Sequence, residues 1–466
     1  MRKNLIASYI AGIRDRTTGE AYSNIIRYFL PEFVTALALY SFPLWLDSLF
    51  ISTLKSTPMY ATLGATNNLL HLLIKIAEAF SVGTVVLAGN YNGMHEYKKV
   101  GSVIKDAFWL SCFFGAVIAL FLYCGAYHIY VWYGVPHEII DLGIPFLRLR
   151  AIAMFFTFIY LALVAFLRSI KNTRGAMYIF ISGALVFVLF DYMLIFGAFN
   201  MPKLGLNGSA IATIIQSIIM IIVSCIYIFT SPRYKSYGID LLSSITDFAY
   251  VKELLRLSWP VVLDKAALAI AYIWLCKMIA PMGTCALATF AVVKDLERFA
   301  FLPAIAFAQV ITILVSNDYG AGHWTTIKTN IKKTVFLASI MVFSILLFFI
   351  IFSHKILPLF DKQGDFTPMA VRVFPILSVL VFFDLLQLIL SGALRGAGNV
   401  KIVMVVRLLI CVGYFVPVSY ALSLLPLEDM TLKFILIYGS FYIGNALMSV
   451  VYIGRFRGQQ WKSKTI

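Results

Sequence analysis

The sequence predicts an all-α polytopic membrane protein with twelve transmembrane helices in two pseudo-symmetric six-helix bundles. Its 466 residues are 61% hydrophobic and only 13% charged, with a mean hydropathy of +0.88. A soluble domain has too little interior to hide so much apolar surface. Apolar runs of about 20 residues, the length that a helix needs to cross a hydrocarbon core, recur along the chain. The third observation is a repeat that relates the two halves.

Twelve apolar runs mark the predicted spans. They cover residues 28–50, 60–89, 104–133, 143–167, 176–199, 206–230, 254–282, 285–317, 334–360, 371–394, 402–424 and 431–454. Neither the N-terminal tail nor the connection at 231–253 is long enough to fold as a soluble catalytic domain.

The net charge of +16 indicates membrane topology rather than a nucleic-acid surface. Lys and Arg form no single patch. Most lie in alternate connections, while the opposite set is sparse and includes Lys55, Arg148 and Arg150. Cytoplasmic loops carry such an excess of basic residues. We therefore predict a protein of the plasma (inner) membrane with both termini in the cytoplasm, surrounded by lipid and without a nucleic-acid partner. We also expect it to be a monomer.

Three pairs of motifs relate the two halves at a nearly constant separation, each on one predicted side of the membrane. The pairs are Pro31 with Pro260, N-Y-N-G-M-H at 90–95 with D-Y-G-A-G-H at 318–323, and L-R-S-I-K-N at 167–172 with L-R-G-A-G-N at 394–399. Parallel repeats of this kind form two bundles that rock about a central substrate site. The predicted parts are an N-terminal bundle (1–230), a cytoplasmic linker (231–253) and a C-terminal bundle (254–466).

Four carboxylates fall inside predicted spans, where a charge costs several kcal/mol unless it faces water or a partner. Asp47 lies late in the first span, Asp191 in the fifth, Asp264 in the seventh and Asp384 in the tenth, where Gln387 shares its face. We predict that these carboxylates bind the coupling proton or Na⁺, with Asp384 as the best candidate. The alternatives are an interfacial position for Asp47 and a hydrogen bond to a neighbouring helix for Asp384.

A polar stripe follows the second span, because Asn67, His71, Lys75 and Glu78 are three or four residues apart. This face is expected to be wet or to pair with another helix. In one interpretation it lines the substrate path. In the other it holds a structural ion pair, since Lys75 and Glu78 have the spacing of helical neighbours.

The eighth span carries a similar group, in which Lys294 and Glu297, and Asp295 and Arg298, have i,i+3 spacing. We expect these charges to neutralise one another while lining water, and we assign Lys294, Asp295, Arg298 and Gln387 to the substrate path. The cysteines lack C-x-x-C pairing and indicate no metal site. The expected ion is therefore the coupling H⁺ or Na⁺, with Na⁺ placed at Asp47 or Asp384, and no cofactor is expected.

Several motifs resemble the multidrug and toxic compound extrusion (MATE) family. D-L-L-Q-L-I-L-S-G-A-L-R-G-A-G-N at 384–399 is similar to the family's tenth-span aspartate and the loop that follows it. A-F-L-R-S-I-K-N-T at 165–173 is similar to the matching first-half loop, and L-G-L-N-G-S-A-I-A-T at 204–213 to the opening of the sixth span. Pro31 to Asp47 resembles the first-span proline and aspartate. The resemblance extends from the first helix to the last.

The resemblance implies a secondary transporter that extrudes small amphipathic compounds, often cations, in exchange for H⁺ or Na⁺ by alternating access. It makes Asp47 and Asp384 the coupling carboxylates of the two bundles. Leu268 departs from the family, since some members have a glutamate there. Interior basic residues are also unusual along a path for cations: Lys75, Lys265, Lys294 and Arg298. These departures keep an anionic or zwitterionic cargo open.

Two other functions compete with export. A flippase for a lipid-linked saccharide belongs to the same superfamily, although twelve spans and the L-R-G-x-G-N loop favour the exporter. An integral membrane transferase would need clustered His and acidic residues at a membrane face. The six histidines show no metal spacing such as H-E-x-x-H, and a pump would need a phosphate-binding loop that the sequence lacks. We therefore expect a transporter and not an enzyme.

Overall fold

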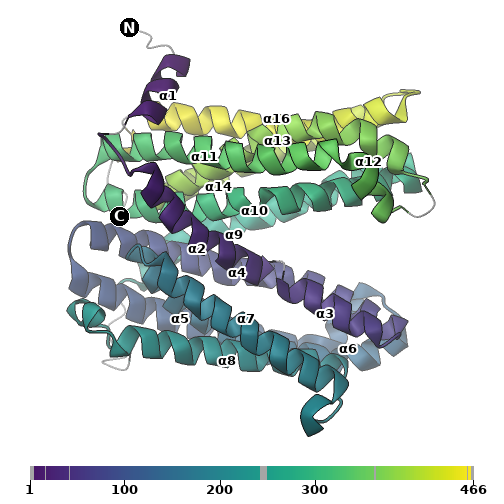
Figure 1. Cartoon of the computed structure of the whole chain (residues 1–466), viewed down its shortest axis with the longest axis horizontal. Helices are drawn as coiled ribbons and strands as arrows, with labels where there is room; N and C mark the ends of the chain where they lie inside the picture. Colours follow the sequence, from purple (N-terminus) through teal and green to yellow (C-terminus); the bar gives the residue numbers. More distant parts are fainter. Residues whose placement is uncertain are drawn as a thin grey trace. The chain divides into compact units, whose positions relative to one another are not determined.

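A computed structural model describes residues 5–15, 17–40, 42–241, 249–361, 364–458 and 460–462. All regular secondary structure in these ranges is helical, which confirms the predicted all-α class (Figure 1). Residues 242–248 of the predicted linker lie outside the described residues.

Within the described ranges, ten helices are long and apolar enough to cross a membrane. They are α4 (Thr57–Gly93), α5 (Tyr97–Tyr133), α6 (His137–Ser169), α7 (Thr173–Phe196), α8 (Leu206–Thr230), α10 (Thr284–Gly320), α11 (Trp324–Ile351), α13 (Thr367–Gly396), the run from α14 to α15 (Val400–Leu424) and α16 (Met430–Arg457). Inside that run, α14 (Val400–Ile410) and α15 (Val416–Leu424) flank a π-helical turn, η5 (Cys411–Phe415).

The two remaining predicted spans coincide with α2 (Tyr22–Tyr40) plus α3 (Phe42–Thr53), and with α9 (Val251–Ile279). These helices are not among the ten, and the count of twelve stays a prediction with which they are consistent. The short elements are α1 (Leu5–Arg14), α12 (Ser353–Ile356), η1 (Ala198–Asn200), η2 (Pro232–Tyr237), η3 (Ala280–Met282), η4 (Leu357–Leu359) and η6 (Gln460–Lys462).

Polar caps and glycines set several helix ends. Ser56 accepts a hydrogen bond from the Met59 amide at the start of α4, and Asn172 accepts one from Gly175 at the start of α7. Such caps satisfy amides that have no partner inside the helix. Gly197 ends α7 in the left-handed conformation, at φ 75°, which glycine adopts without a Cβ clash.

The chain divides into two compact units, here called the N-terminal unit (Leu30–Val262) and the C-terminal unit (Met1–Phe29 with Leu263–Ile466). This division differs from the predicted boundaries at the N-terminal segment. There, Lys332 of α11 donates to the Ser8 carbonyl at 2.7 Å, and Lys333 donates to the Glu20 carbonyl at 2.9 Å. These contacts attach the first residues to α11 of the C-terminal unit.

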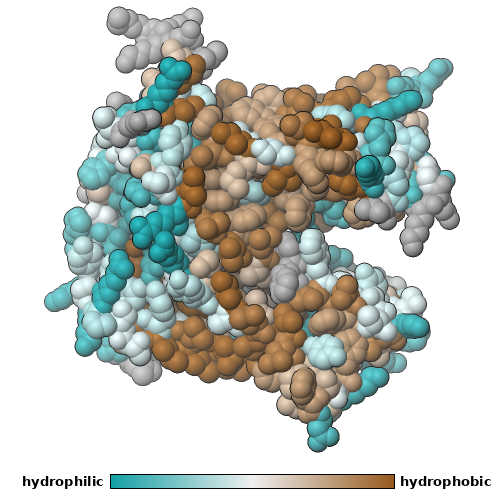
Figure 2. Space-filling model, viewed as in Figure 1, coloured by the Kyte–Doolittle hydropathy of each residue, from teal (hydrophilic) through white to brown (hydrophobic). Residues whose placement is uncertain are grey.

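In the N-terminal unit, α4, α5 and α6 pack together, and α7 packs along α8 (Figure 1). One apolar cluster joins α3, α4, α6, α7 and α8: Ile51, Leu63, Phe146, Ile195, Leu206 and Ala210. Gly208 brings α8 close to α7, because a Cβ there would lie 2.7 Å from the Leu194 carbonyl. In Figure 2 the visible sides of α7 and α8 are largely hydrophobic while hydrophilic residues gather toward the helix ends, as lipid contact requires.

Each unit carries a buried ion pair at a repeat-related arginine. In the N-terminal unit Arg168 donates twice to Glu32, at 3.0 and 2.8 Å, and joins α6 to α2. In the C-terminal unit Arg395 donates to Asp264 at 2.5 Å and joins α13 to α9, and Arg407 of α14 donates to the same carboxylate. These contacts fix the proline-containing helix, α2 or α9, to the helix that ends in the L-R motif, α6 or α13.

Candidate functional site

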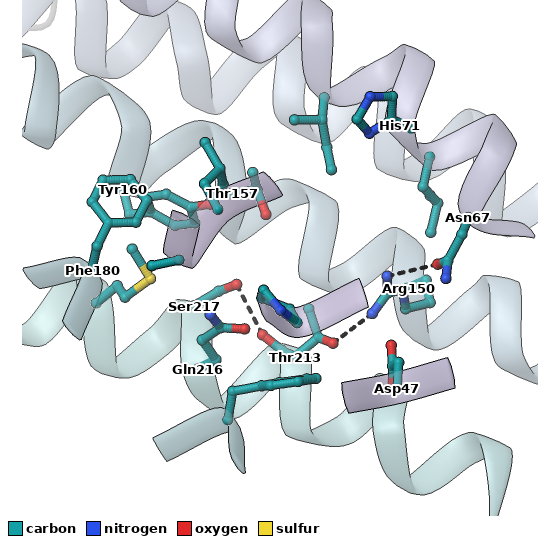
Figure 3. Close-up of a pocket in the computed structure, with 17 residues that line it drawn as sticks. Asp47, Asn67, His71, Arg150, Thr157, Tyr160, Phe180, Thr213, Gln216 and Ser217 are labelled. Carbon is teal, nitrogen blue, oxygen red and sulfur yellow. Dashed lines mark hydrogen bonds between the residues drawn. The ribbon is translucent and has the colours of Figure 1, made fainter. Parts of the chain in front are cut away.

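A cavity of about 110 Å³ opens inside the N-terminal unit. Its lining comes from α2, α3, α4, α6, α7 and α8, and all of its lining residues belong to this unit. Polar groups gather at one end, where Figure 3 shows Asp47, Asn67, Arg150 and Thr213 together. The cavity is concave and largely apolar with a few convergent polar groups, which is typical of small-molecule sites.

Asp47 contributes the acidic group of this cavity. Its side chain, on α3, is only 2% exposed and accepts a hydrogen bond from the Ser209 hydroxyl. Ser209 lies in the first turn of α8, immediately after the close approach at Gly208. The packing of α8 on α7 therefore positions the donor that Asp47 uses.

Asp191 adds a second buried carboxylate that interacts electrostatically with the first. It lies on α7, is 0% exposed, and neither of its oxygens has a hydrogen-bond donor among the described residues. Asp191 interacts electrostatically with Asp47 and with Arg150. An ionised carboxylate that is buried without a donor is costly, so this group needs a proton or another cation close by.

Arg150 is the site residue that sequence reasoning missed. Counting basic residues placed it in an outer connection, but α6 begins at His137, so Arg150 lies about three turns inside the helix. Its guanidinium donates to Thr213 at 2.6 Å and to Asn67 at 3.1 Å (Figure 3). The sequence did hold one indication of this position, because apolar residues flank Arg150 on both sides and place it inside the span.

The polar stripe of the second span divides into two parts. Asn67 and His71 line the cavity, whereas Lys75 forms an ion pair with Glu78 at 3.1 Å. Both interpretations from the sequence therefore describe part of α4, with Asn67 and His71 facing the cavity and the next turn forming the pair. The role of Asn67 and His71 in transport stays a prediction.

The C-terminal unit holds a separate acidic group. Asp384 on α13 accepts a hydrogen bond from Asn445 of α16 at 3.1 Å, which is the alternative that the sequence left open. Glu297 accepts from Tyr438 at 2.5 Å, while Lys294 lies 4.6 Å from the centre of the Tyr272 ring. The expected pairing of Lys294 with Glu297 is thus replaced by contacts with tyrosines.

The remaining predicted residues lie apart from these carboxyl clusters or are already paired. Asp295 and Arg298 are exposed on α10, and Gln387 is buried on α13. Asp264 forms ion pairs with Arg395 and Arg407. Two guanidinium groups on one buried carboxylate are typical of a structural ion pair, so we assign no coupling role to Asp264.

Comparisons with known proteins agree with these observations. The MatE family model matches residues 33–193 and 260–421. The probable multidrug resistance protein YoeA of Bacillus subtilis is 25% identical over 362 residues, covering 76% of this chain and 77% of YoeA. The probable multidrug resistance protein NorM of Thermotoga maritima is 21% identical over 361 residues, covering 77% of both chains.

Solved structures share the fold. A crystal structure of MATE in the bent conformation has a TM-score of 0.83 and 18% identity, covering 93% of this chain and 94% of its own. A mutant of the Vibrio cholerae MATE transporter VcmN has a TM-score of 0.86 and 16% identity, covering 95% and 98%. With the family model matched over both halves, the chain belongs to the MATE (MatE) family of membrane-embedded secondary transporters.

Proposed function

We propose that this transporter exports small amphipathic organic compounds in exchange for protons, and that Asp47 and Asp191 are the proton-binding pair of the N-terminal unit. The observation that carries the proposal is Asp191, whose two carboxylate oxygens are buried without a donor in the described structure. Its neighbour Asp47 has one hydroxyl donor and lines the cavity. Two buried carboxylates that interact electrostatically and have so few donors favour binding a proton at one of them.

The nearby guanidinium favours H⁺ over Na⁺ at this pair. A Na⁺ ion would need several oxygen ligands and would be repelled by Arg150, which interacts electrostatically with both carboxylates. A proton neutralises one carboxylate without needing further ligands. In the C-terminal unit we propose Asp384 as a second coupling group, held by Asn445. The proposal places a monomer in the plasma membrane, with both termini in the cytoplasm.

Transport in proteoliposomes tests the proposal. A pH gradient is expected to drive uptake of a fluorescent amphipathic amine, whereas a Na⁺ gradient at constant pH is not. Asp47→Asn and Asp191→Asn should abolish the response to the pH gradient and retain exchange of the amine between equal concentrations. Asp141→Asn is the matched control, because Asp141 is exposed near the start of α6. Uptake driven by Na⁺ alone, or normal proton-driven uptake by Asp191→Asn, would contradict it.

A further inference from the structure

The guanidinium of Arg150 is held rigidly at the polar end of the cavity. It reaches from α6 and donates to a side chain on α4 and to one on α8, so three helices fix its position. Its central carbon also lies 5.7 Å from the centre of the Phe146 ring. A planar fork that is fixed in this way loses little side-chain freedom when it binds a planar anion.

The two acceptors that Arg150 uses are neutral. A guanidinium has five N–H donors, and the two contacts go to the hydroxyl of Thr213 and the amide oxygen of Asn67. A simple counter-ion for Asp47 would instead donate to its carboxylate, as Arg168 does to Glu32. Arg150 thus interacts electrostatically with Asp47 and Asp191 without donating to either carboxylate in the described structure, and it keeps N–H donors at the cavity that these contacts do not occupy.

The rest of the lining provides two further kinds of surface. Asp47 presents a carboxylate close to the guanidinium, and Tyr160 and Phe180 lie at the far end from Arg150 (Figure 3). Thr157 and Phe187 also line the cavity. Opposite charges side by side, next to an aromatic surface, match a compound that carries both charges on one end of an apolar body.

We propose that Arg150 selects zwitterionic amphipathic cargo, binding a carboxylate of the compound while its ammonium group faces Asp47. This inference rests on the proposed function, because it names the cargo class of that exporter. This binding mode is also compatible with exchange for protons, since protonation of Asp47 and Asp191 weakens only the contact with the ammonium group of the cargo. The carboxylate remains bound by Arg150, so compounds that carry one are preferred over amines that do not.

A matched pair of fluorescent probes tests the selection. Nε-dansyl-lysine is a zwitterion, and dansylcadaverine is the same molecule without the carboxylate. Binding to the purified transporter is followed by dansyl fluorescence. The wild type is expected to bind dansyl-lysine more tightly than dansylcadaverine. Arg150→Gln should weaken dansyl-lysine binding about 10- to 100-fold, the usual effect of losing a charge-assisted bidentate contact, and should leave dansylcadaverine binding unchanged or tighter.

Two further variants separate selection from stability. Arg150→Lys keeps the charge but not the fork, so it should weaken dansyl-lysine binding less than Arg150→Gln. Arg148→Gln is the matched control, because Arg148 is exposed two residues earlier on α6. A wild type that prefers dansylcadaverine or binds neither probe, or an Arg150→Gln variant with an unchanged ratio of affinities, overturns the inference. Proton-driven uptake of the amine in those preparations would show that the proposed function still holds.

Discussion

Asp264 and Asp191 are both buried aspartates inside spans, but replacing each with Asn is expected to have opposite consequences. Asp264 accepts hydrogen bonds from Arg395 at 2.5 Å and from Arg407. Removing its charge leaves two buried guanidinium groups without their partner. Breaking a buried ion pair from one side costs about 3–5 kcal/mol. Asp191 has no donor to lose among the described residues, so its replacement should cost at most about 1 kcal/mol.

Thermal unfolding of the purified variants measures this difference. For a unit of this size, 1 kcal/mol corresponds to about 2–4 °C in the unfolding midpoint. Asp264→Asn should therefore unfold about 6–20 °C below the wild type, while Asp191→Asn should stay within about 4 °C of it. The fraction of the Asp264→Asn variant that remains folded should retain proton-driven transport. An Asp264→Asn variant with a normal unfolding midpoint but no proton-driven transport would refute this reasoning. It would show that Asp264 is one of the coupling carboxylates.

Two further predictions concern packing and pH. Gly208→Val should lower stability by about 1–3 kcal/mol, because even a Cβ at this position would lie 2.7 Å from the Leu194 carbonyl; thermal unfolding tests it, and an unchanged midpoint contradicts it. Burial would raise the pKa of Asp361, but hydrogen bonds from Thr367, Phe366 and Gly364 lower it to about 2. The stability that this lowered pKa provides is complete above about pH 4 and is lost as the pH falls toward 2. The unfolding midpoints of wild type and Asp361→Asn should therefore converge as the pH falls from about 4 to about 2, and a constant difference would contradict this.

The sequence predicted most of the fold because membrane helices are specified locally. Apolar runs of sufficient length determine where the spans lie, and the positions of Asp47 and Asp384 within those runs mark them as unusual without any knowledge of their neighbours. The pair between Lys75 and Glu78 was also accessible, since residues three apart on one helix meet.

The partners of the buried charges were not accessible in this way. Asp264 pairs with residues that are more than 130 positions away in sequence, on α13 and α14, and no periodicity predicts such a contact. Arg150 was misplaced because the topology rule assigns each Lys or Arg near a predicted span end to a connection. The rule does not distinguish such a residue from an arginine that lies inside the helix. Glu297 was expected to pair with Lys294 along one helix but accepts from Tyr438 of α16 instead.

The buried ion pairs of Arg168 and Arg395 show that the two halves of the chain share a contact even where the residues that form it are not aligned in sequence. Glu32 directly follows Pro31, whereas Asp264 comes four residues after Pro260. The two acids are therefore offset by three residues, about one turn, and approach the equivalent arginine from the same side of the helix. An alignment that matches Pro31 with Pro260 places Glu32 opposite Val261, and Thr35 opposite Asp264, and counts both positions as mismatches. A search for internal repeats in such proteins would therefore be more sensitive if it compared the ion pairs that the acidic residues form, and not only the residues at aligned positions.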